Sequence, residues 1–255
     1  EGVKTATGVY TDRYSATHFT EATTSHLHAA SQNSDAYALL NGGKTNINGA
    51  VNLHAVTGAG DAMGLVSRYE VSGLEFGRDS SGKVTTAAGS NLNINVEAGS
   101  GRVMGVMSHE GGDITFGGDL SINAKADGDA YGIWANKSNG SVIMANTASK
   151  AAVNGNVYIK IDRTANDNDF KLVRALQATK SGSIKVNTEG GQKLVQVDGD
   201  LYADGKGYTD SSSVALEITV NPWNVVEGGV ELRGSLGENI APMGGNLPTD
   251  GSSYI

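Results

Sequence analysis

A short apolar pattern recurs along the chain at intervals typical of a repeat protein. Each copy has a small or β-branched residue, a larger apolar residue, Ala or Gly, and a second large aliphatic residue. The copies are residues 36–39, 62–65, 103–106 and 130–133. Two intervals are 26 and 27 residues and the third is 41. Such periods predict one elongated body that grows by adding units.

Each copy lies between two other apolar segments, so three short strands are expected to make one unit. An alternating segment precedes each copy, with Leu27, Leu53, Ile94 or Ile122 at its centre. A third segment follows and contains Ile47, Leu74, Ile114 or Val142. The polar run from Gly77 to Thr86 is interpreted as an insertion between two units. Parallel stacking of these strands predicts an all-β fold, a right-handed parallel β-helix (β-solenoid) with about three short strands per coil.

Strict alternation along a strand predicts which side chains face the core. If the last residue of each copy points inward, the residue two positions earlier should do so too, and Ala or Gly should point outward. The residues expected inside are Leu39, Leu65, Val106 and Ile133 together with Tyr37, Met63, Met104 and Tyr131. Each inward position would then form a continuous apolar column through the stack.

The repeat divides the chain into a regular part and a tail. Residues 1–220 are expected to form the β-helix, with an irregular first coil. Residues 221–255 are expected to be irregular or to continue the β-helix, and their apolar end suggests truncation from a longer chain. No apolar run approaches the ~18 residues of a membrane span, and no signal peptide is evident.

Composition narrows the function classes. With 36 Gly, 3 Pro and 6% aromatic residues, the chain favours many tight corners around a thin aliphatic core. The net charge of -8, with Lys and Arg scattered, argues against a nucleic-acid partner. The chain has no Cys, which excludes disulfide and thiol chemistry and suits an exported protein.

One row of outward positions is the principal candidate binding surface. In the first strand of successive units, polar side chains line up in a ladder, and a second row flanks it. The first row is His28, His54, Asn95, Asn123 and Lys160, and the second is His26, Asn52, Asn93, Ser121 and Tyr158. This strip could bind glycans or peptides. The alternative is structural, with solvated side chains hydrogen-bonded along the stack.

Two further features were weighed as sites. Trp134 is a candidate sugar-stacking residue if exposed and a core residue otherwise. His28 and His54 lack a neighbouring carboxylate or Cys, so no metal site is predicted, and no cofactor is expected. Polar bulges at residues 77–88, 136–140, 165–169 and 205–213 are additional places for binding, because loops on a rigid scaffold usually carry it.

The acidic residues are expected to be structural. Asp35, Asp61 and Asp129 directly precede copies of the pattern, with Arg102 in the equivalent place, where Asx side chains can close corners by bonding backbone amides. Neither Asp127 with Asp129 nor residues 167–169 have the spacing of a calcium loop. No carboxylate cluster, nucleophile elbow or phosphate loop is found, so no catalytic residue is assigned and a non-enzyme is expected.

The repeats at residues 60–65 and 128–133, with their Gly-Asp start, resemble those of a known family. Residues 5–220 resemble the β-helical passenger domain of a bacterial autotransporter adhesin of the type V secretion class. The resemblance implies a protein that is secreted through the outer membrane and displayed on the cell surface. It also implies a role in cell adhesion, biofilm formation and virulence. Attachment to the membrane is expected only through a translocator domain, which this sequence lacks.

Two functions compete. The first is a non-enzymatic adhesin fragment that binds a host-cell or bacterial surface protein or glycan, or a second copy of itself. The alternative is a polysaccharide-degrading β-helix, a lyase or hydrolase similar to a tailspike. The alternative predicts that Asp and Glu residues from consecutive coils converge outside the helix.

Overall fold

The computed structural model of the 255-residue chain describes twelve stretches of it. They are residues 5–68, 82–109, 111–136, 150–153, 155–163, 172–179, 183–187, 195–198, 200–203, 216–219, 230–233 and 240–243. Every regular element in these stretches is a β-strand, and none of them contains a helix able to cross a membrane.

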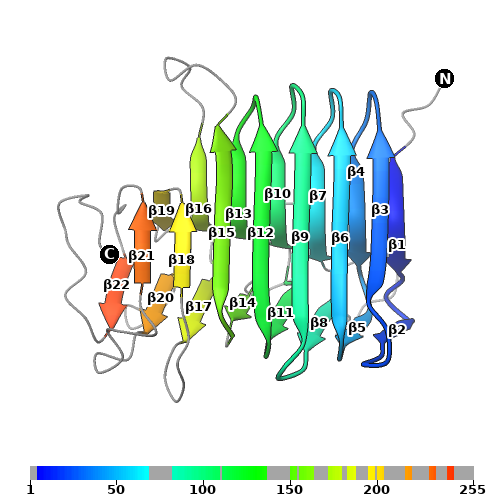
Figure 1. Ribbon diagram of the computed structural model, residues 1–255, viewed down its shortest axis with the longest axis horizontal. Helices are drawn as coiled ribbons and strands as arrows, with labels where there is room; N and C mark the ends of the chain where they lie inside the picture. Colours follow the sequence, from blue (N-terminus) through cyan, green and yellow to red (C-terminus); the bar gives the residue numbers. More distant parts are fainter. Residues whose placement is uncertain are drawn as a thin grey trace.

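The strands form three parallel sheets, which the described strands from β1 to β21 visit in turn (Figure 1). Sheet A contains β1 (Ala6–Thr11), β4 (Ala36–Asn41), β7 (Ala62–Arg68), β10 (Val103–His109), β13 (Ala130–Asn136), β16 (Val173–Thr179) and β19 (Asp200–Ala203). Sheet B contains β2 (Ala16–Phe19), β5 (Lys44–Ile47), β8 (Lys83–Thr86), β11 (Asp113–Phe116), β14 (Lys150–Val153), β17 (Ser183–Asn187), β20 (Leu216–Thr219) and β22 (Ile240–Met243). Sheet C contains β3 (Ser25–Ser31), β6 (Ala50–Thr57), β9 (Asn91–Ala98), β12 (Asp119–Ala126), β15 (Val157–Arg163), β18 (Val195–Asp198) and β21 (Val230–Arg233).

One strand from each sheet makes a round, and successive rounds stack along the long axis of the molecule. In Figure 1 the strands of sheet C lie in front of those of sheet A, with sheet B below. This all-β arrangement is compatible with a parallel β-solenoid. In the tail, β21 pairs with β18 and β22 pairs with β20, so both strands extend sheets that begin before residue 220.

The predicted register is confirmed in two of the three sheets. The first residues of the repeated pattern are partners in sheet A, from Ala36 through Ala62 and Val103 to Ala130. The central residues of the alternating segments are partners in sheet C, from Leu27 to Ile122 by way of Leu53 and Ile94. The spacing of apolar residues therefore determines which strands pair and in what alignment.

The third strand of two units was misplaced by the sequence reading. Leu74 and Val142 lie outside the described residues, and β8 and β14 occupy their expected place in sheet B. The run 77–86 is therefore not wholly an insertion, because its last four residues are β8. In β8, Val84 and Thr86 face the core and are buried, whereas Lys83 is exposed. The sequence of β8 looks polar because one of its two core residues is a threonine, so it does not stand out as a strand.

The core is a thin aliphatic column enclosed by the three sheets. Its fully buried side chains include Leu39, Leu65 and Ile133 from sheet A, and Phe116 from sheet B is the largest of them. Removing these side chains from water contributes roughly 25 cal/mol per Å² of apolar surface. Because equivalent residues stack from round to round, the core side chains of each round pack against those of the next.

The expectation that the second residue of each pattern faces the core is wrong. Tyr131, Met104 and Met63 belong to a separate cluster on the other face of sheet A, with Leu40 and Val66. We call this the second cluster; Tyr37, Met107 and Trp134 pack against it. Its central side chains are nevertheless well buried, with Met104 at 2% exposure. The outer face of sheet A is therefore apolar over four strands.

The reason is a break in the pleat at the third residue of the pattern. Every strand pairing from β1 to β16 in sheet A passes over this position, so the third and fourth residues both face inward. Ala38, at the third position of β4, is fully buried in the core. The residue expected outside is thus inside, and the period-2 rule fails because it assumes a regular pleat.

Close approach of sheet C explains why the third residue is Gly in three of the four patterns. A Cβ on Gly64, Gly105 or Gly132 would lie 2.2, 2.4 or 2.6 Å from the Cγ2 atom of an isoleucine of sheet C. Each Cβ would also lie within 2.7 Å of a backbone carbonyl oxygen of the next round. The repeated Gly is therefore a packing requirement at the narrowest part of the core.

We expect Gly105→Ala to lower the free energy of unfolding by about 1–3 kcal/mol, the usual cost of overpacking a core. Its methyl group would lie 2.4 Å from Ile122 Cγ2 and 2.7 Å from the Gly132 oxygen. Urea unfolding followed by circular dichroism measures the change. Ala38→Gly at the equivalent position is the comparison, with an expected loss of about 1–2 kcal/mol from backbone entropy and one buried methyl group, and with no new close contact. Wild-type stability for Gly105→Ala would contradict the close approach.

Candidate functional site

The five polar residues predicted to line up do form one column on the outer face of sheet C. The residues are strand partners in sequence order: His28 on β3, His54 on β6, Asn95 on β9, Asn123 on β12 and Lys160 on β15. All five are exposed, and their strand neighbours on either side point into the core. The flanking row from His26 to Tyr158 forms a parallel column two residues away along each strand.

Side-chain amides link the rounds within these two columns. Asn93 Nδ2 donates to Asn52 Oδ1 at 2.9 Å, and Asn123 Nδ2 donates to Asn95 Oδ1 at 3.1 Å. Asn52 Nδ2 also lies 3.3 Å from His26 Nδ1. The structural interpretation of the ladder therefore holds for these residues. The same bonds fix the orientation of the amides, so these side chains are also suited to bind a partner.

The first two rungs of the main column are stacked imidazoles. The rings of His28 and His54 are nearly parallel, at an angle of 10°, with centroids 4.8 Å apart. Partial burial lowers the pKa of His54, a positive charge on His28 lowers it further, and Glu97 partly offsets both. A stack of two rings tolerates protonation poorly because the second proton would bring two like charges into contact.

A third column on this face carries paired charges. Lys125 Nζ lies 2.7 Å from Glu97 Oε1, one round away, and this bond raises the pKa of Lys125. Lys160 Nζ lies 3.1 Å from Asp162 Oδ1 on its own strand. Exposed pairs of this kind contribute little stability. Their effect is to cancel charge beside the amide columns.

Trp134 does not belong to this face. It lies on β13 in sheet A and is half-buried against the second cluster. Its ring stacks on that of Tyr131, with centroids 4.8 Å apart, and its Nε1 donates to Thr179 Oγ1 at 2.9 Å. The structure thus separates Trp134 from the other five candidates, and its packing matches the core-type alternative more closely than an open sugar platform.

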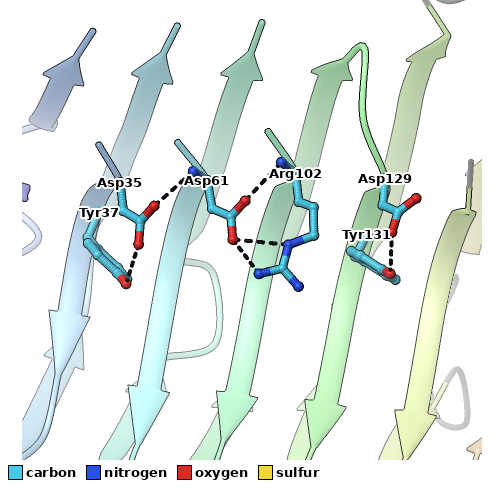
Figure 2. A network of polar contacts seen from close by, with 6 residues as sticks. All are labelled: Asp35, Tyr37, Asp61, Arg102, Asp129 and Tyr131. Atoms are coloured by element: carbon cyan, nitrogen blue, oxygen red, sulfur yellow. Dashed lines mark hydrogen bonds and ion pairs between the residues drawn. The ribbon is translucent and has the colours of Figure 1, made fainter. Parts of the chain in front are cut away.

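A polar network that sequence reasoning described only in part borders the second cluster. Figure 2 shows Asp35, Asp61, Arg102 and Asp129 directly before successive strands of sheet A. The Asp61 amide donates to Asp35 Oδ1 at 2.9 Å, and the Arg102 amide donates to Asp61 Oδ1 at 3.0 Å. Likewise the Leu172 amide donates to Asp129 Oδ1 at 2.9 Å. Each carboxylate therefore bonds the equivalent residue of the next round.

The second oxygen of each carboxylate also accepts a bond. Tyr37 Oη donates to Asp35 Oδ2 at 3.5 Å, and Tyr131 Oη donates to Asp129 Oδ2 at 3.3 Å. Burial, then the nearby Asp129 charge, raises the pKa of Tyr131 to about 12, and burial and Asp35 raise that of Tyr37. Arg102 Nε donates to Asp61 Oδ2 at 3.0 Å, which raises the pKa of Arg102.

The arrangement of these carboxylates indicates what the network does. General acid and base catalysis of glycoside cleavage needs two carboxyl groups facing a bound sugar. Here all six oxygens of the three carboxylates already accept hydrogen bonds from the protein. Four of these bonds join a carboxylate to the next round, and the two from Tyr37 and Tyr131 lie within one round. Among the described residues, no group of three or more His, Asp or Glu side chains could hold a metal ion.

Sequence reasoning missed both the second cluster and the direction of the carboxylate bonds. The sequence does contain a signal for the cluster. The second residue of each pattern and the residue directly after the pattern, such as Tyr131 and Trp134, are large, and they flank the two residues that face inward. Of the polar bulges, residues 82–88 and Asn136 are described. Residues 77–81, 137–140, 165–169 and 205–213 lie outside the described ranges.

Asp61→Ala is expected to lower the free energy of unfolding by about 1–3 kcal/mol, since it strips the Arg102 amide and guanidinium of their acceptor. Asp61→Asn retains a side-chain oxygen for the amide and removes only the charge, so its cost should stay near 0–1 kcal/mol, as for partly exposed ion pairs. Thermal and urea unfolding measure both. Equal losses in the two variants would show that the ion pair, not the bond to the amide, dominates.

The histidine stack should make stability depend on pH. Because the pKa of His54 is lower in the folded chain than its usual 6.5, the unfolded chain binds the proton more readily. The contribution is full above pH 6.5 and is lost as pH falls through the folded pKa. His54→Asn, which copies Asn95 and Asn123, should abolish this part of the loss in melting temperature between pH 7.5 and 5.

The control for that comparison is His18→Asn on sheet B, where His18 Nδ1 lies 3.2 Å from Asn46 Nδ2. It removes a histidine without touching the stack. If His18→Asn and His54→Asn changed the pH dependence of melting equally, stacking would not be the cause.

Comparison with models of protein families, with curated proteins and with solved structures finds no match for this chain. The functional argument therefore depends on the geometry of the described rounds. Two surfaces stand out: the outer face of sheet C, with its amide and imidazole columns, and the outer face of sheet A, with the second cluster and its polar border.

Proposed function

We propose that this chain is a passenger fragment of a secreted bacterial adhesin, displayed at the cell surface and without enzymatic activity. Its rounds would form a right-handed parallel β-helix with three strands each. The right-handed sense is supported by a general rule, since connections between parallel strands of one sheet are right-handed in about 98% of cases. The partner would be a host-cell or bacterial surface protein or glycan, or another copy of the chain.

The observation that carries the proposal is the outer face of sheet C. Its columns present polar side chains held at fixed strand spacing by bonds between rounds. Such a surface can bind a partner without moving, which limits the entropy lost on association. The carboxylates of the sheet A border have every oxygen bonded within the protein, which supports a structural role for them rather than a catalytic one.

Display of the chain on bacteria tests this function. Cells carrying it are expected to adhere to host cells, to matrix proteins or to one another more than cells with an empty display system, and to release no sugar from mixed glycans. A display of Ile133→Asp, which places a charge in the core, is the control for folding. Sugar release, or adhesion equal to that of the control cells, would overturn the proposal.

A further inference from the structure

We propose that the outer face of sheet C binds an uncharged polysaccharide through its amide columns. This inference rests on the adhesin function and names its ligand class. The binding surface, which we call the amide face, consists of Asn52, Asn93, Asn95, Ser121, Asn123 and Tyr158. All six side chains are at least partly exposed, and they lie on four consecutive strands, β6, β9, β12 and β15.

The first argument is charge. The chain carries a net charge of -8, yet none of the six side chains is charged at neutral pH. The nearest charges are compensated, because Glu97 pairs with Lys125 and Lys160 pairs with Asp162. A surface that binds anionic glycans or nucleic acid needs clustered cations. The amide face instead suits a ligand that is polar and neutral.

The second argument is hydrogen-bonding capacity. A side-chain amide has two N–H donors and an oxygen with two lone pairs. The ladder bonds from Asn93 to Asn52 and from Asn123 to Asn95 each use one donor and one lone pair. The amides thus retain both kinds of group in fixed orientations. Sugar hydroxyls, which donate and accept at once, are the matching chemistry.

The third argument is the exposed ring at one end of the columns. Tyr158 is the strand partner of Ser121 and is 40% exposed. An aromatic ring beside amides offers an apolar surface for the C–H face of a sugar and a hydroxyl for its rim. A protein partner is less well served, since protein interfaces have an apolar core and this face is polar. Repetition from strand to strand favours a polymer.

The test uses affinity electrophoresis of the whole chain in gels containing one polysaccharide each. The neutral probes are dextran, laminarin, galactomannan and hydroxyethyl cellulose; heparin and alginate are the anionic probes. At least one neutral probe is expected to retard the chain. The variant Asn93→Ala/Asn95→Ala/Asn123→Ala should bind that probe at least about tenfold more weakly, because three amides that donate and accept are lost. Tyr158→Ala should also weaken binding.

The matched control is Asn46→Ala, which removes a partly exposed asparagine whose Nδ2 lies 3.2 Å from His18 Nδ1 in a similar pair on sheet B. It should bind as wild type does, and circular dichroism and melting temperature should show all variants folded. Retardation by anionic probes alone, equal binding by the triple variant, or no retardation by any neutral probe would overturn the inference. Adhesion of displaying bacteria that is unaffected by the triple substitution would refute this site while leaving the adhesin function standing.

Discussion

The close approach of sheets A and C governs the rest of this structure. At the third residue of three of the four patterns, Gly64, Gly105 and Gly132, an isoleucine methyl group of sheet C fills the space where a side chain would begin. Only Gly fits at these three positions without displacing a neighbour, and the strand of sheet A bends there so that the next residue also faces the core. That bend turns Tyr37, Met63, Met104 and Tyr131 outward and so creates the second cluster.

Stacking in register constrains the chemistry of the outer surfaces. A residue repeated in parallel strands meets its own kind one strand away, and like charges in that position repel. On the outer face of sheet C the chain avoids this with amides that bond to one another and with Glu97 opposite Lys125. At the sheet A border, Arg102 takes the place of a fourth aspartate and pairs with Asp61. The same constraint explains why the amide face is neutral while the chain as a whole is acidic.

The period of the sequence was enough to predict parallel strands, three per round, and the partners in sheets A and C. Which side faced the core in sheet A was not predictable by alternation, because the pleat breaks at the third residue of every pattern, from the β1 and β4 pair to the β13 and β16 pair. The position of β8 was missed because Thr85 and Thr86 are the same residue type, and the sequence does not show that only Thr86 is buried.

For the candidate site, the sequence predicted the column from His28 to Lys160 and, as one of two interpretations, hydrogen bonds along the stack, but not which residues pair. The direction of an Asn or Asp bond, within a turn or to the next round, depends on distances that sequence spacing does not contain. The bond from the Arg102 amide to Asp61 spans 41 residues of chain. An insertion between two rounds changes that separation and leaves the bond intact, since the register is set by the sheets.

A stack of rounds also determines how a surface of this kind can gain affinity. One amide pair contributes little, because a hydrogen bond to a neutral ligand replaces one to water. Two such pairs lie one strand apart, one in each column, so a ligand with repeating groups would contact both at once, and the second contact would form at high effective concentration. Binding would then increase with the number of rounds in contact rather than with the strength of any single residue. On this proposal, the side chains of the amide face can each be ordinary while the face as a whole selects its ligand.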